Sequence, residues 1–131
     1  MALITIEMLE GRTPGERREI SAAVRSAVAE ALSVPGEDPV VRLIEHHPDN
    51  FLRPFPDRHS ESYTLVMLTI FQGRSMQARR RLYAGVVQRL GAFGVPPDDV
   101  AVVVQEVPME NWGVRGGVPA SEVDVGFRVD V

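Results

Sequence analysis

The chain contains no cysteine, and this absence excludes disulfide bonds, thiolate metal sites and a cysteine nucleophile. It also lacks any run of about 18 consecutive apolar residues, so the sequence predicts no transmembrane helix. Residues 1–7 have neither a basic start nor a long apolar core, and we therefore expect no signal peptide. A formal net charge of −4 disfavours binding to nucleic acid or to a membrane surface. These exclusions leave a soluble, cytoplasmic globular protein.

What the chain does contain is an ordinary globular composition. Its 131 residues are 44% hydrophobic and 24% charged. A chain of this length buries about two-thirds of the surface of its unfolded state when it folds. We therefore expect a single domain over residues 1–131.

The sequence repeats itself. Residues 4–13 and residues 66–75 are apolar stretches that end in Gly-Arg-Thr and Gly-Arg-Ser, at an offset of 62 residues. A Val-Pro turn, acidic residues and an apolar stretch occur over 34–45 and again over 95–106, at an offset of 61. Matches in the same order at nearly the same offset indicate an internal repeat, over about residues 1–50 and 63–112.

The first repeat is predicted to form a strand, a helix and a second strand. Residues 2–9 are β-branched and apolar, which favours a strand. Thr13 and Glu16 then have the spacing of a capping box, and apolar residues follow with a helical period. The Val-Pro-Gly sequence at 34–36 ends the helix, and residues 40–45 form the second strand.

The second repeat follows the same pattern. It has a strand over 63–71, Ser75 as the helix cap, a helix that ends at Gly94 and a strand over 100–107. Two strands joined by a helix of this length should be parallel, with a right-handed crossover. Residues 46–62, between the repeats, contain three prolines and no periodicity, which indicates a loop with room for a short strand.

The last residues alternate strictly. Over 123–131 valine or phenylalanine occupies every second position, and Asp, Gly or Arg lies between them. A period of two predicts a strand with one buried face. Because an apolar edge strand needs a partner sheet, we expect this segment to lie near a contact with another subunit.

These residues together resemble the tautomerase superfamily. The resemblance rests on a strand, Gly11-Arg12-Thr13, a helix, a Val-Pro turn, a strand ending in Glu45, and the later Asn111-Trp112-Gly113. The tandem arrangement is similar to the fused members of that family, the malonate semialdehyde decarboxylases and cis-3-chloroacrylic acid dehalogenases among them. It implies an α/β (α+β) fold in which two pseudo-symmetric β-α-β repeats form one mixed four-stranded sheet with two helices on one face. It also implies a homotrimer with its sites near subunit contacts.

The resemblance also assigns candidate site residues. Ala2 stands where the family has its catalytic amino-terminal proline, and a primary amine there can still act as a base. Arg74 matches the arginine that binds the carboxylate of the substrate, for which a guanidinium offers two parallel donors. Asp38 matches a catalytic acidic residue, and Trp112 matches an aromatic wall of the site. Gln72 occupies a substrate-binding position at which the decarboxylases have a second arginine.

Three further positions follow from the residues and the repeat. Arg42 is a cation among apolar strand residues, which suits either a second substrate contact or an ion pair with a carboxylate. Arg12 is the twin of Arg74. The position equivalent to Ala2 in the second repeat is Thr64, inside the chain and without an amine, so no working site is expected around Arg12.

Each candidate also has a structural interpretation. Arg74 could simply brace the turn that precedes its helix, Asp38 could shape a loop before a strand, and Trp112 could be a core residue. Adjacent histidines at 46–47 point to opposite faces of a strand, so no metal site is expected, and no cofactor motif is present. Arginines at 79–81 fit a solvated helix face better than a site for an anionic partner.

Two functions remain open. The first is a divergent enzyme of this superfamily that acts weakly on a small 2-oxo or unsaturated carboxylic acid, by proton transfer, hydration or decarboxylation. The second is a non-catalytic trimeric member that serves as a binding or scaffold protein. The expected partners are a small carboxylic acid and two further copies of the chain, with no nucleic acid and no membrane.

Overall fold

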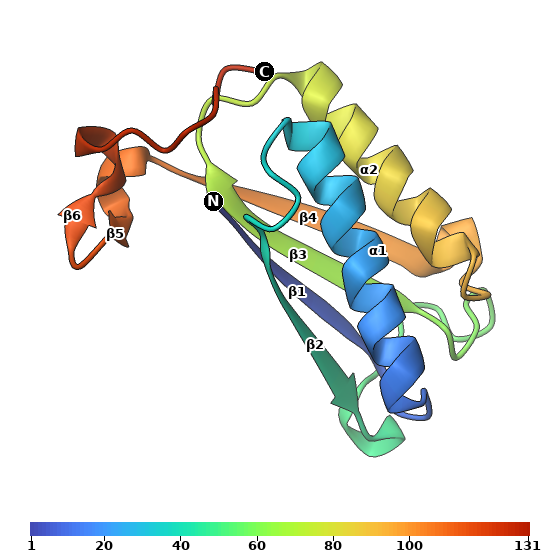
Figure 1. Cartoon of the computed structure of the whole chain (residues 1–131). Coiled ribbons are helices and arrows are strands. Elements are labelled where there is room, and N and C mark those ends of the chain that lie inside the picture. Colours follow the sequence, from blue (N-terminus) through green and yellow to red (C-terminus); the bar gives the residue numbers. More distant parts are fainter.

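Four strands form one mixed sheet, and two helices cover one of its faces (Figure 1). The computed structural model describes all residues from 1 to 131. The elements of this layer are β1 (Ala2–Leu9), α1 (Pro14–Leu32), β2 (Val40–His46), β3 (Thr64–Phe71), α2 (Met76–Gly91) and β4 (Val100–Val107). The strand order is β2-β1-β3-β4, in which β1 is parallel to β2, β3 is parallel to β4, and β1 is antiparallel to β3. The predicted tandem β-α-β fold is confirmed.

Local signals in the sequence start both helices. Thr13 accepts a hydrogen bond from the amide of Glu16, and the Glu16 side chain bonds back to the Thr13 amide, so the capping box is complete. Ser75 caps α2 in the same way by accepting from the amide of Ala78. These contacts satisfy amides that have no partner inside the helix.

Equivalent glycines end the first strand of each repeat. Gly11 and Gly73 have φ values of +131° and +120°, a backbone conformation that side chains with a Cβ rarely adopt. Each glycine turns the chain from its strand into the arginine and cap residue that begin the helix. The internal repeat therefore extends to the backbone conformation of these turns.

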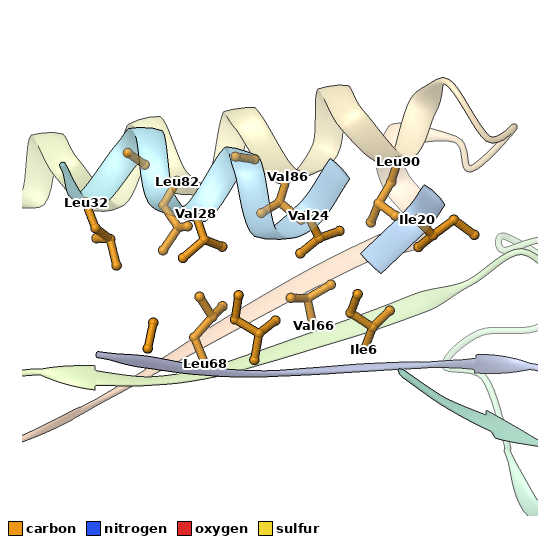
Figure 2. Close-up of a cluster of buried hydrophobic side chains, with 14 of the residues drawn as sticks. Ile6, Ile20, Val24, Val28, Leu32, Val66, Leu68, Leu82, Val86 and Leu90 are labelled. Carbon is orange, nitrogen blue, oxygen red and sulfur yellow. The ribbon is translucent and has the colours of Figure 1, made fainter. Parts of the chain in front are cut away.

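The main core lies between the helices and the sheet (Figure 2). Every second residue of β1 and β3 points toward the helices and is buried, and the helices present residues spaced three or four apart. The fully buried aliphatic side chains that meet there include Ile6, Ile20, Val24, Val28, Leu32, Val66, Leu68, Leu82, Val86 and Leu90. This packing fixes both ends of the sheet relative to the helices.

The other face of the sheet carries no helix (Figure 1). Val40 and Ile44 on β2 and Val103 on β4 point away from the core and are 46%, 41% and 42% exposed, and Arg42 and Thr5 share that face. Large apolar residues that remain accessible on one face are a feature of association surfaces. Neither helix of the structure has the length and apolar character needed to cross a membrane.

The connections outside this layer are short. A 3-10 turn, Pro48–Asn50, interrupts the loop between the repeats, which contains no strand. After β4 a small hairpin of β5 (Gly113–Val114) and β6 (Val118–Pro119) projects from the sheet, flanked by 3-10 turns at Met109–Asn111 and Ala120–Glu122. The hairpin brings the end of the chain back toward the start of α2 (Figure 1).

The predicted strand over residues 123–131 is wrong. This segment forms no ladder with any strand, although its residues alternate between half-buried and exposed as the sequence indicated. Gly126 has a φ of +82°, and its amide donates to the Asp124 side chain, so the backbone bends away from an extended conformation. Alternation reports that one side of a segment is buried, and here Val125, Phe127 and Val129 are buried by packing on Phe71 and Trp112, without strand pairing.

Candidate active site at the start of β1

The amino terminus, Asp38 and Arg74 meet at one end of the sheet. β1 begins there, opposite the end of β3, where Ala2 pairs with Ile70. The nitrogen of the Met1 amine lies 3.4 Å from Oδ2 of Asp38, and Arg74 is close enough to influence the charge of that amine. The side chain of Ala2 is only 1% exposed, so the start of the chain is held in the core.

Asp38 is positioned by the turn that joins α1 to β2. Ser33 takes a left-handed conformation, with φ of +55°, and ends the helix. The Asp38 amide then donates to the carbonyl of Pro35 at 2.9 Å, which closes a turn before the strand. The Asp38 carboxylate therefore lies just before the start of β2, beside the amine at the start of β1.

Arg74 is almost completely buried, with 4% of its surface exposed. Its Nη1 donates to the main-chain carbonyl of Leu32 at 2.6 Å and to that of Arg128 at 3.3 Å. Its Nε is also buried and has no hydrogen-bond partner. The guanidinium thus has one donor engaged by the protein's own backbone and another that is free of any acceptor.

The surroundings shift the protonation equilibria of this cluster. Burial lowers the pKa of the Met1 amine below its ordinary value of 8.0; Arg74 lowers it further, and Asp38 opposes the shift. Burial also lowers the pKa of Arg74, whereas Asp38, Asp130 and Glu106 oppose that shift. A larger share of the amine is therefore neutral near pH 7 than for an amine in water, as a general base requires.

Aromatic side chains form a wall beside Arg74. The rings of Phe71 and Trp112 meet edge to face with centroids 4.9 Å apart, and Trp112 Nε1 donates to the carbonyl of Val107. Phe127 stacks on Phe71 with centroids 6.2 Å apart, and the Arg74 guanidinium lies 5.8 Å from the centre of the Phe127 ring. Trp112 thus reaches Arg74 only indirectly, through Phe71 and then Phe127.

The remaining two sequence candidates are placed differently from each other. Gln72 directly follows β3, two residues before Arg74, with its side chain exposed, and its main-chain amide donates to the carbonyl of Val107. Arg42 lies on the uncovered face of the sheet and donates to the hydroxyl of Thr5 at 3.1 Å. The structure therefore brings together the amino terminus, Asp38 and Arg74, and it does not bring Arg42 to them.

Sequence reasoning did not find the backbone groups that hold Arg74. The carbonyls of Leu32 and Arg128 carry no signature of residue type, because every residue has one. The ring of Phe127 did carry a signal, since it stands on the apolar side of the alternating segment 123–131. That signal indicated a buried face without indicating what the face covers.

The equivalent end of the second repeat has different contacts. Arg12 donates to Glu16 at 3.4 Å and does not bond to the opposite helix. Asp99, the twin of Asp38, is 2% exposed and accepts from the amide and hydroxyl of Ser60, with Nδ1 of His59 at 2.9 Å from its other oxygen. Burial would raise the pKa of Asp99, but the hydrogen bonds from Ser60 and His59 outweigh it and lower the pKa.

Comparison with known families decides the membership of this chain. Two family models, both described as tautomerase enzyme, match residues 3–54 and residues 42–115, and the second match covers more than half of the chain. The chain belongs to the tautomerase family. Its two tautomerase matches overlap over residues 42–54, which include most of β2 and the start of the linker.

Two curated tautomerases match about half of this family member. A probable tautomerase of Ralstonia nicotianae is 40% identical over 58 residues, which cover 44% of this chain and 81% of the relative. The 2-hydroxymuconate tautomerase of Pseudomonas putida is 37% identical over 59 residues, which cover 44% of this chain and 92% of the relative. Each match is about as long as one repeat of the present tautomerase.

Solved tautomerase-like structures match nearly the whole chain. A malonate semialdehyde decarboxylase inhibited by 3-bromopropiolate is 26% identical, with a TM-score of 0.80 over 89% of this chain and 92% of that one. A fused 4-OT described as a symmetric trimer has a TM-score of 0.81 at 22% identity, over 91% and 96% of the two chains. The second likeness shows that the tandem fold is shared.

Proposed function

We propose that this tautomerase family member acts at a low rate on a small 2-oxo or unsaturated carboxylic acid, by proton transfer, hydration or decarboxylation. The observation that carries the proposal is the meeting of the amino terminus, Asp38 and Arg74 at the start of β1. An amine of lowered pKa, a carboxylate and a guanidinium are the groups that bind such an acid and move a proton on it. Relatives are named for small acids: 2-hydroxymuconate is an unsaturated acid of this class, and malonate semialdehyde is a small 3-oxo acid.

Each group has a distinct role in this proposal. Arg74 binds the carboxylate of the substrate through its free donors, and it adds to the effect of burial in lowering the pKa of the neighbouring amine. The amine, of Met1 or of Ala2 after removal of Met1, takes a proton from one atom of the substrate and returns it to another. Asp38 activates a water molecule or orients the substrate, and Trp112 with Phe71 excludes bulk solvent from one side.

The low rate follows from two residues. The amino-terminal proline of the family is a secondary amine on a rigid ring, so its lone pair keeps one direction. The primary amine at the start of this chain rotates freely and must give up that freedom when the substrate binds. At position 72 a glutamine offers a neutral donor in place of a second cation. A glutamine lacks the Coulomb attraction and the two parallel donors that a guanidinium offers a carboxylate, so the substrate is held less tightly.

A non-catalytic member of the family is the second candidate. One observation favours it: Arg74 is 4% exposed, and the backbone carbonyls of Leu32 and Arg128 accept hydrogen bonds from its Nη1. In that case Arg74 is a structural residue that links the two repeats, and the apolar sheet face is the feature under selection.

A blocking experiment distinguishes the two candidates. The chain contains no lysine, so its terminal amine is the only primary amine that an acylating reagent can modify. Intact mass first shows whether Met1 is retained. A spectrophotometric assay with enol-pyruvate-type acids then compares the native protein, the acylated protein, Ala2→Pro, and Ala2→Pro combined with Arg74→Ala.

We expect a weak native activity that acylation removes. Where Met1 is cleaved, Ala2→Pro should raise the activity, and the additional Arg74→Ala should remove that gain, because about 1.5–3 kcal/mol of charge-assisted hydrogen bonding is lost. Robust activity that survives acylation would show that the working group is not the amine. No activity in any variant would favour the non-catalytic candidate.

A homotrimer is also part of this proposal. It is supported by the uncovered apolar face of the sheet and by the likeness of the chain to a fused 4-OT described as a trimer. Burial of that face between copies would remove the side chains of Val40, Ile44 and Val103 from water.

A further inference from the structure

We propose that residues 123–131, here called the strap, close the Arg74 site, and that a small carboxylic acid reaches the guanidinium only when the strap moves away. The strap runs from the β5–β6 hairpin to the start of α2 and passes over the end of the sheet (Figure 1). The part of this inference that concerns an acid rests on the proposed function. The closure itself does not, because it concerns the access of any reagent to Arg74.

The strap touches three successive residues of the turn after β3. The side chain of Val129 approaches Gly73 so closely that a Cβ on this glycine would lie 3.5 Å from Cγ1 of the valine. The Arg128 carbonyl accepts from Nη1 of Arg74 at 3.3 Å. The Ser75 hydroxyl donates to the carbonyl of Val131 at 2.6 Å.

Phe127 adds an apolar contact on the inner side of the strap. Its ring lies 5.8 Å from the Arg74 guanidinium and stacks on Phe71 at 6.2 Å. Val125 and Val129 belong to the same small cluster, which is separate from the main core. The strap therefore covers Arg74 and is held there by its own apolar contacts with Phe71.

The strap also supplies groups that imitate an acid. Its Arg128 carbonyl occupies a donor of Arg74 that a substrate carboxylate would use, and the negative charge of Asp130 is close enough to stabilise the guanidinium. An incoming carboxylate competes with both. It also offers an acceptor to the buried Nε, which has none in the closed state, and an unsatisfied buried donor is unfavourable.

The attachment of the strap is light enough for it to open. The strap forms no ladder with the sheet, and its ion pair between Arg128 and Asp130 is exposed and internal to the segment. Its hydrogen bonds to the Arg74 turn are the two to Arg74 and Ser75; the others, Val123 with Ala120 and Asp124 with Arg115, hold only its first residues to the hairpin. Segments with few buried contacts open at a small free-energy cost while the remainder of the fold persists.

Chemical labelling of arginine tests the closure directly. Phenylglyoxal modifies accessible guanidinium groups, and digestion followed by mass spectrometry gives a separate rate for each arginine. Arg80 on α2 is exposed and serves as the internal reference. The full chain, Phe127→Ala and a chain ending at Glu122 are compared. If the strap is open for a tenth of the time in the full chain, its loss raises the Arg74 rate by about tenfold.

A matched control uses another phenylalanine that lies beside an arginine. Phe55 is 63% exposed in the linker, and the Arg58 guanidinium lies 4.6 Å from the centre of its ring. Phe55→Ala should leave the Arg74 rate unchanged. If the shortened chain does not fold, as judged by circular dichroism, Phe127→Ala decides the question.

We expect Arg74 to react much more slowly than Arg80 in the full chain and to gain reactivity in Phe127→Ala and in the shortened chain. A gain in the shortened chain alone also supports the strap, held then by its backbone contacts. Labelling of Arg74 as fast as that of Arg80 in the full chain overturns the proposal. So does equal protection of Arg74 in both variants, because the cover would then come from elsewhere.

The experiments distinguish failure of the strap proposal from failure of the proposed function. A strap that opens in the labelling experiment, together with a protein that binds and converts no small acid, leaves the closure intact and removes the proposed function. Where binding is found, the variants that expose Arg74 should bind malonate or pyruvate more tightly, by a factor close to their gain in labelling rate. Unchanged binding in those variants overturns the competition between the acid and the strap.

Discussion

The guanidinium of Arg74 donates a hydrogen bond of 2.6 Å to the carbonyl oxygen of Leu32, the last residue of α1. The last turn of α1 contains no basic residue, so this arginine of the other repeat supplies the positive charge that favours the negative end of a helix. α2 has Arg89 in its own last turn, and Arg12, the twin of Arg74, bonds to Glu16. The repeated arginine therefore joins the two repeats at one end only.

The twin arginines should differ in their effect on stability. Arg74→Ala should lower the free energy of unfolding by about 1–3 kcal/mol, because it leaves the Leu32 carbonyl without its partner in a buried place. Arg12→Ala should change it by less than about 1 kcal/mol, because its pair with Glu16 is partly exposed. Urea denaturation of both variants measures the difference. Equal losses would contradict the assignment of Arg74 as the link between the repeats.

The terminal amine should titrate below its ordinary value of 8.0. Only the neutral amine is acylated, so the acylation rate should rise with pH and reach its plateau earlier than for an amine in water. Asp38→Asn removes a charge that raises this pKa and should move the plateau to lower pH, whereas Arg74→Gln should move it to higher pH. Rates measured between pH 5 and 9 would contradict this if both variants shifted in the same direction.

Asp99 should stabilise the fold in a pH-dependent way. Asp99→Asn removes a charged acceptor of bonds from Ser60 and His59 and should lower the free energy of unfolding by about 1.5–3 kcal/mol at pH 7. Because the folded-state pKa of Asp99 lies below 3.8, its contribution is complete above that value and is lost as the pH falls through the folded-state pKa. Denaturation at pH 7 and near pH 3 should show the difference between the two proteins shrinking, and a constant difference would argue against a charged Asp99.

The turn glycines should be equally intolerant of a side chain. Gly11→Ala and Gly73→Ala each force a residue with a Cβ into a positive φ, which costs about 1–2 kcal/mol. Neither new Cβ meets a heavy atom closer than 3.5 Å, so the backbone term should dominate in both. Thermal denaturation that finds only one of the two variants destabilised would show that the two turns are not equivalent.

The uncovered sheet face should hold the trimer together. A charge at Ile44 or Val103, as in Ile44→Asp or Val103→Lys, would have to be buried between copies and should give monomers of 14.4 kDa in light scattering. Leu52→Lys is the control, because Leu52 is 94% exposed in the linker and away from this face. A native protein that is already monomeric at micromolar concentration removes the trimer from the proposal.

The sequence predicted the layer of strands and helices well because their limits depend on neighbouring residues. A capping box at Thr13, a cap at Ser75 and the Val-Pro turns act over three or four residues, and the structure contains all of them. The conformation of the strap, residues 123–131, was predicted poorly. The alternation over 123–131 describes one buried side, and nothing local distinguishes a strand in a ladder from a bent segment on an aromatic cluster.

The candidate site was only partly accessible to the same reasoning. The repeat indicated that Arg74 and Arg12 occupy equivalent turns, and they do, but it did not indicate which groups these two arginines bond to. The difference comes from partners distant in the sequence, a helix end for Arg74 and the linker residues His59 and Ser60 for the twin of Asp38. Such partners are fixed by the tertiary packing of the whole chain.

The linker between the repeats has a consequence for how many sites one chain can carry. It enters β3 at Thr64, the counterpart of Ala2 in β1, so the second repeat has a peptide bond at the position where the first has its amine. Chemistry that needs the amine is thereby confined to one end of the sheet. The other end is released from that requirement, and its acidic residue has become the anchor of a loop.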